Sequence, residues 1–132
     1  MKDTATYLGA NGWLLEMAGL GVLLDPWLTG PLVFPPGAWL LKGEMPKLMP
    51  IPDQLDLLLL TQGLPDHAHP ETLQALPKAI PVVASAAAAR VVQHLGVETI
   101  TALQPGDKTT VNSLKIQATA GAAVPAVENG YL

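Results

Sequence analysis

The sequence contains no cysteine, and only 14% of its 132 residues are charged. The lack of cysteine excludes disulfide bonds and metal sites built from thiolates. Lysines and arginines number 7 against 11 aspartates and glutamates, which gives a formal net charge of −4, and the basic residues form no cluster. Because binding to nucleic acid requires concentrated positive charge, the sequence predicts no nucleic-acid partner.

Long apolar segments and targeting signals are also absent from the sequence. No apolar run approaches the ~20 residues that cross a bilayer. The opening residues 1–13 have neither an apolar signal core nor an arginine-rich transit pattern. We therefore expect a cytoplasmic protein that does not enter a membrane. A hydrophobic content of 49% over this length predicts one packed domain, residues 1–132.

The pattern of apolar and turn-forming residues predicts an α/β fold. Residues 55–61 form a nearly continuous apolar run, which is typical of a strand buried on both faces. Asn11-Gly12 is a strong hairpin signal between two apolar segments. The remaining strands are predicted at 21–26, 80–85, 97–103 and 113–120, and residues 128–132 are predicted to form a turn that enters a final strand. The helices are predicted at 70–76 and 86–95, the second with Ser85 as its N-cap and Gly96 just past its end. Helices alternate with strands only in the middle of the chain, so we expect a mixed sheet with helices on one face.

Residues 26–54 form a proline-rich loop that separates the first three strands from the rest. The segment holds seven prolines, at positions 26, 31, 35, 36, 46, 50 and 52. Proline lacks a backbone donor, so a regular ladder is not expected there. The loop also carries Trp27, Phe34 and Trp39, which indicates that it packs onto the domain, or serves as a lid or partner surface.

A polar loop follows the apolar run, with the sequence Thr-Gln-Gly-Leu-Pro-Asp-His-Ala-His at 61–69. Asp66, His67 and His69 place a carboxylate and two imidazoles at the mouth of a strand, and zinc and iron sites use such groups. The alternative is a turn that needs no metal. In that interpretation Asp66 caps the following helix, His67 is a structural hydrogen-bonded residue and His69 lies at the helix start.

The chain resembles the metallo-β-lactamase fold superfamily, in particular its lactonase-like and uncharacterised metal-dependent hydrolase branch. The resemblance rests on the strand ending at Leu8-Gly9, on residues 21–28, and on the apolar strand that enters Thr61. It covers nearly all of the chain. It implies half of an αβ/βα sandwich, the N-terminal half, and hydrolysis by a metal-bound water.

The family's metal-binding motif after this strand is Thr-His-x-His-x-Asp-His, and the match is partial. Thr61, Asp66 and His67 fit, whereas Gln62 and Leu64 stand where the two histidines belong. The loop in which the family's next histidine falls has none here, and the opening hairpin reads Gly-Ala-Asn where relatives often have Gly-His-Ala. The resemblance therefore implies a degenerate site.

In this degenerate site Asp66 is the candidate catalytic residue, and Asp66, His67 and His69 are the candidate metal ligands. They would hold one zinc, iron or manganese ion, or no metal at all. The resemblance also assigns Asp25 to the support of the site, although this residue is equally well explained by the end of a strand before Pro26.

Two functions follow from these expectations. The first is a metal-dependent hydrolase with an altered or single-metal site that acts on an unidentified small molecule. The second is a relative that kept the fold, lost the chemistry and now binds a small molecule or a protein. The missing imidazoles favour the second. A half-sandwich also exposes one sheet face, so we expect a homodimer or association with a missing C-terminal half.

Overall fold

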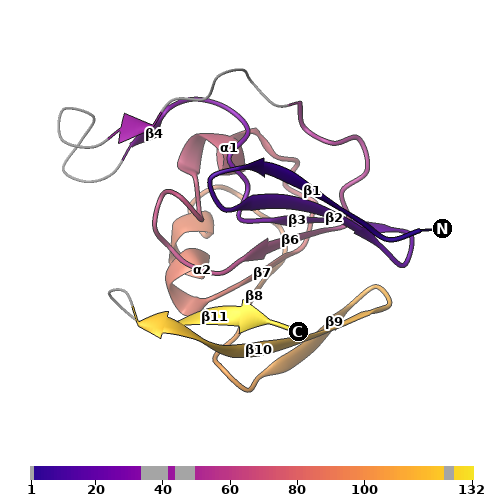
Figure 1. Cartoon of the computed structure of the whole chain (residues 1–132). Helices are drawn as coiled ribbons and strands as arrows, with labels where there is room; N and C mark the ends of the chain where they lie inside the picture. Colours follow the sequence, from indigo (N-terminus) through magenta and orange to yellow (C-terminus); the bar gives the residue numbers. More distant parts are fainter. Residues whose placement is uncertain (1, 34–41, 44–49, 124–126) are drawn as a thin grey trace.

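The computed structural model describes residues 2–33, 42–43, 50–123 and 127–132 (Figure 1). Phe34 and Trp39 of the predicted proline-rich loop lie outside the described residues. The described part of that loop contains a short antiparallel ladder between β4 (Leu32–Val33) and β5 (Lys42–Gly43). A ladder was not expected in a proline-rich segment, and none of the four paired positions is a proline.

The main sheet has six strands in the order β1-β2-β3-β6-β7-β8. Its strands are β1 (Thr4–Gly9), β2 (Gly12–Met17), β3 (Leu20–Leu24), β6 (Leu57–Leu60), β7 (Val82–Ala84) and β8 (Ile100–Ala102). The first three strands pair antiparallel, and β3, β6, β7 and β8 pair parallel. The predicted mixed sheet is confirmed. All four leucines of β6 are buried, as expected for a strand covered on both faces.

Two helices cover one face of this sheet (Figure 1). Helix α1 (Pro70–Ala75) begins after His69, and α2 (Ala86–Val92) begins after Ser85, whose side chain accepts a hydrogen bond from the Ala88 amide. The predicted cap at Ser85 is therefore confirmed. Helix α2 ends at Val92, earlier than the predicted end just before Gly96. None of the described helices is long and apolar enough to cross a membrane.

A second, three-stranded sheet covers the opposite face (Figure 1). It has the order β11-β10-β9, with β9 (Lys108–Val111), β10 (Leu114–Ala123) and β11 (Val127–Tyr131). The buried side chains of Ile116 and Ala118 belong to the same core cluster as Leu57 and Val83 of the main sheet. This corrects the expectation of a bare sheet face. Burial of the apolar residues of β3, β6 and β7 favours this packing.

The turn between β1 and β2 is fixed tightly against the end of β3. Gly9 pairs with Gly12, so Ala10 and Asn11 form a two-residue loop, and Ala10 has a positive φ of 48°. A Cβ atom at Gly12 would lie 3.2 Å from the carbonyl oxygen of Asp25. Glycine at this position therefore allows the hairpin to approach the residue that follows β3. The loop residue Asn11 is placed at that end of the sheet.

We predict that truncation of Leu60, which is fully buried between the main sheet and the helices, strongly destabilises the fold. Leu60→Ala is expected to lower the free energy of unfolding by about 2–5 kcal/mol, because it leaves a cavity in a packed core. Urea denaturation followed by circular dichroism measures the change. Leu132→Ala is the control, since Leu132 is 77% exposed and should change stability by no more than about 0.5 kcal/mol. Equal effects of the two substitutions would contradict this packing.

Candidate functional site

The polar residues of the sequence motif gather at the carboxyl ends of the parallel strands β3 and β6. Asp25 directly follows β3, and Thr61 directly follows β6. Asp66 and His67 lie in the loop between β6 and α1, and Asn11 reaches them from the β1–β2 turn. Sites in sheets of this kind commonly form at the carboxyl ends of parallel strands.

Asp25 is the buried centre of this arrangement. It is 3% exposed, and its backbone φ of +41° is uncommon for a residue other than glycine. Its Oδ1 accepts the backbone N–H of Thr61 at 2.8 Å, and its Oδ2 accepts the Thr61 hydroxyl. The ring of His67 also reaches Oδ2, at 2.7 Å. These contacts satisfy a carboxylate that would otherwise be costly to bury.

The contact with Asp25 determines which nitrogen of His67 carries a proton. A carboxylate only accepts hydrogen bonds, so Nδ1 of His67 is the donor in the 2.7 Å contact. The other nitrogen, Nε2, lies 3.3 Å from Nδ2 of Asn11, which is a donor. Nε2 is therefore the acceptor, and its lone pair faces the amide of Asn11. A carboxylate that orients a histidine in this way is typical of metal-binding histidines.

Asp66 lies beside His67, and one of its carboxylate oxygens lacks a partner. Oδ2 is 3.1 Å from Nδ2 of Asn11 and 3.5 Å from Nε2 of His67. Oδ1 is buried without a hydrogen-bond partner among the described residues. The side chain as a whole is 28% exposed. The structure thus brings Asp66 and His67 together, as the motif predicts, with one buried oxygen left for a donor or a cation.

His69 is not brought to Asp66 and His67. It is 2% exposed. Its Nε2 lies 2.9 Å from the carbonyl oxygen of Pro31, and its Nδ1 lies 2.9 Å from the hydroxyl oxygen of Thr72. Because a carbonyl only accepts, Nε2 donates and Nδ1 is the acceptor that caps α1 at the Thr72 amide. Both ring nitrogens are therefore used within the protein, and they brace the start of the proline-rich loop against α1.

The donor set does not by itself fit a catalytic metal. Catalytic zinc sites use three protein ligands and an open position. Within the part of the chain that the structure describes, no three histidine, aspartate or glutamate side chains converge in a way that holds a metal ion. Asp66 and His67 supply two ligands, and Leu64 has no ligand atom. The unpartnered Oδ1 of Asp66 is the one feature that a cation would satisfy.

Asn11 is the site residue that sequence reasoning missed. It was interpreted only as a turn former, yet its amide contacts both Asp66 and His67 across more than 50 residues of sequence. The available signal was its place in the Gly-Ala-Asn turn, at the hairpin where relatives of the family often carry a histidine.

The comparisons with known proteins agree with this fold. A family model described as the beta-lactamase superfamily domain matches residues 4–130. The chain belongs to this family, and with it to the metallo-β-lactamase fold superfamily. The predicted family and fold class are thereby confirmed. No curated protein matches the sequence.

Solved structures of related fold are longer than this chain. CmlA, a diiron β-hydroxylase from Streptomyces venezuelae, is 19% identical with a TM-score of 0.71, and the match covers 99% of this chain and 27% of that one. An isothiocyanate hydrolase from Delia radicum gut bacteria is 25% identical with a TM-score of 0.61, covering 92% and 48%. A metallo hydrolase from the archaeon Ignicoccus hospitalis is 18% identical with a TM-score of 0.65, covering 98% and 55%. The chain thus spans from about a quarter to about half of these structures.

We predict that Asp25→Asn both destabilises the protein and releases the ring of His67. The amide replaces one acceptor oxygen with a donor. The backbone N–H of Thr61 can only donate and keeps the remaining oxygen, so the amide nitrogen faces His67, whose Nδ1 loses its acceptor. The free energy of unfolding should fall by about 1–3 kcal/mol. Nitrogen NMR of the histidine ring should show the proton moving from Nδ1 towards Nε2. Asp53→Asn, at an exposed position, is the control, and an unchanged His67 tautomer in Asp25→Asn would contradict the assignment.

Proposed function

We propose that this chain is a metallo-β-lactamase-fold protein with a degenerate metal site, which by itself does not carry out metal-dependent hydrolysis. One observation carries the proposal. In the described residues, no three ligand-type side chains gather in a way that could hold a metal ion, and the amide of Asn11 contacts both motif residues, Asp66 and His67. A water-activating metal requires more protein ligands than these two.

The proposal can be compared with the activities of the structural neighbours. One is a diiron hydroxylase, one is an isothiocyanate hydrolase and one is a metallo hydrolase. Metal-dependent hydrolysis is therefore the activity that a complete site on this fold would be expected to support. What this chain contributes is the scaffold for such a site: Asp25 holds His67 in one orientation, and the loop after β6 holds Asp66 beside it.

Metal content tests this proposal directly. Protein purified without an affinity tag is incubated with excess zinc, iron(II) or manganese, desalted and measured by elemental analysis, beside His67→Ala. We expect no retained metal in either protein, and no metal-dependent turnover of lactone, ester or phosphodiester substrates. A stoichiometric metal that is lost in His67→Ala would overturn the proposal and would support a surviving single-metal hydrolase.

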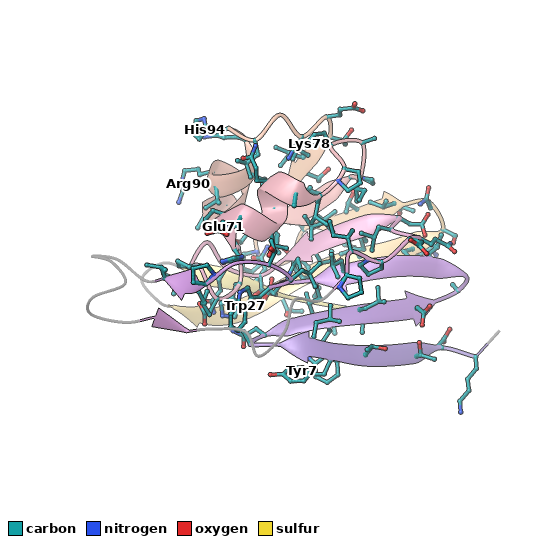
Figure 2. The ribbon with its side chains drawn as sticks, turned by 90° about the horizontal axis from the view of Figure 1, so that it is seen from above. Tyr7, Trp27, Glu71, Lys78, Arg90 and His94 are labelled. Atoms are coloured by element: carbon teal, nitrogen blue, oxygen red, sulfur yellow. The ribbon has the colours of Figure 1, made fainter. Side chains whose placement is uncertain are left out.

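A second function, protein binding, is favoured by an apolar patch on the β1–β2 hairpin. We define the hairpin patch as Tyr7, Trp13 and Met17, which are 56%, 38% and 38% exposed. Tyr7 pairs with Trp13, and their ring centroids are 5.2 Å apart. Alternation along β2 places Trp13 and Met17 on one face. Tyr7 lies at the outer edge of the sheet (Figure 2).

The partner we propose for the hairpin patch is a second copy of the chain. Strand β1 is an edge strand of the main sheet, so its outer backbone groups are available for pairing. Antiparallel pairing of two β1 strands about a two-fold axis would extend the sheet and bring the two hairpin patches together. This geometry gives a homodimer. It pairs the open edge of β1 and buries the exposed aromatic side chains.

We predict that Trp13→Ser weakens this dimer by about tenfold or more, because an aromatic side chain at the centre of an interface contributes strongly to affinity. Light scattering across a concentration series measures the dissociation constant. Leu132→Ser is the matched control, since it removes an exposed apolar side chain from the other sheet. A monomer at all concentrations in the natural chain would contradict the dimer.

A further inference from the structure

We propose that the side-chain amide of Asn11 takes the place of a cation between Asp66 and His67, and that it thereby closes this half-site to metal ions. The inference rests on the proposed degenerate site and names the residue responsible for its closure. It makes Asn11 a positioning residue that acts on the ligand atoms of its neighbours.

The geometry centres on one nitrogen atom. Nδ2 of Asn11 lies 3.1 Å from Oδ2 of Asp66, 3.1 Å from the backbone oxygen of Asp66 and 3.3 Å from Nε2 of His67. A carboxylate oxygen, a carbonyl oxygen and an imidazole nitrogen thus surround it. These are the atom types that bind divalent metals. At this position the protein has an NH₂ group, whose two hydrogens carry positive partial charge and donate to the same lone pairs.

The amide does not satisfy all of the acceptor atoms that surround it. It has two hydrogens for three acceptor atoms, and it reaches only Oδ2 of the Asp66 carboxylate. The other oxygen, Oδ1, stays buried without a hydrogen-bond partner in the described residues. The cluster therefore retains an anionic character that a neutral amide does not cancel. This remaining negative charge would attract a metal ion if the amide were replaced by a ligand.

The turn itself does not explain why an asparagine stands at position 11. Asparagine is favoured in hairpin turns because it tolerates positive φ. In this turn the positive φ values fall on Gly9 and Ala10, and Asn11 is not among the residues with positive φ. Most residue types would therefore suit its backbone. What distinguishes asparagine is the amide directed at Asp66 and His67.

The hairpin holds this amide firmly in place. The hydroxyl of Tyr7 donates to the carbonyl of Ala10 at 3.0 Å, and Gly12 lies against the backbone of Asp25 and Pro26. Asn11 thus reaches the loop after β6 from a separate element whose backbone is fixed on both sides. A cation could enter only if this amide were displaced, which would break its hydrogen bonds to Asp66 and His67.

Substitution of Asn11 by aspartate gives the sharpest test. Asn11→Asp keeps the shape of the side chain and exchanges the donor nitrogen for a ligand oxygen beside Asp66 and His67. We expect its affinity for Zn²⁺, measured by calorimetric titration, to exceed that of the natural chain by about 100-fold or more. Zn²⁺ should also raise its thermal midpoint. Adding His67→Ala to this variant should abolish both effects.

Two further proteins make the test independent of charge and of folding. Asn112→Asp introduces the same charge at the β9–β10 turn, where Asn112 has a φ of +52°, and should leave Zn²⁺ affinity unchanged. Asn11→Ala removes the amide without adding a ligand or a charge, and should raise Zn²⁺ affinity by about tenfold. Asn11→Ala replaces Asn11→Asp as the test protein if repulsion between the new carboxylate and Asp66 prevents that variant from folding.

The outcomes of these titrations distinguish a failure of this inference from a failure of the proposed function. If the natural chain does not bind Zn²⁺ and the Asn11 variants do, the amide is what closes the site. If neither the natural chain nor any folded Asn11 variant binds Zn²⁺, the inference is wrong and the proposed degenerate site stands. If the natural chain binds Zn²⁺ as tightly as Asn11→Asp, both the proposed function and this inference are overturned.

Discussion

The buried carboxylate of Asp25 is the interaction on which the rest of the site depends. It connects the end of β3 with the end of β6, through Thr61, and with the loop after β6, through His67. Removing one of these donors would leave a buried carboxylate with fewer partners, which is costly. The positive φ of Asp25 is tolerated because these contacts fix the residue from several sides. The contacts also orient the ring of His67, so the same carboxylate supports both the fold and the site.

This coupling shows that the shape of the site is supported by contacts that involve no metal. The hydrogen bonds of Asp25 to Thr61 support the junction between β3 and β6, whether or not a metal is bound next to His67. His69 likewise supports packing, since its two ring nitrogens bind Pro31 and Thr72. None of these contacts involves the side chain of Gln62 or Leu64. The local geometry therefore does not depend on a metal ligand at either of these two motif positions.

The sequence predicted the elements whose signals are local. The apolar run of β6 and the cap at Ser85 were recognised because strand burial and helix capping are encoded within a few neighbouring residues. The pairing of Asp66 with His67 was predicted through a family motif. The cover of the second sheet face was not, because the packing of β10 onto β6 and β7 depends on contacts between segments far apart in the chain. The early end of α2 at Val92 also escaped the pattern.

The roles of His69 and Asn11 show the same limit at the level of single side chains. His69 was a candidate metal ligand and Asn11 was interpreted only as a turn former, because sequence spacing does not fix the direction in which a loop side chain points. His69 turns towards Pro31 because it caps α1, and Asn11 turns towards Asp66 because the hairpin is anchored against Asp25. In each case a tertiary contact decides between a metal ligand and a hydrogen-bonding residue. In this structure the group that faces His67 Nε2 is the side-chain amide of Asn11, which an anchored hairpin brings there from more than 50 residues away in the sequence.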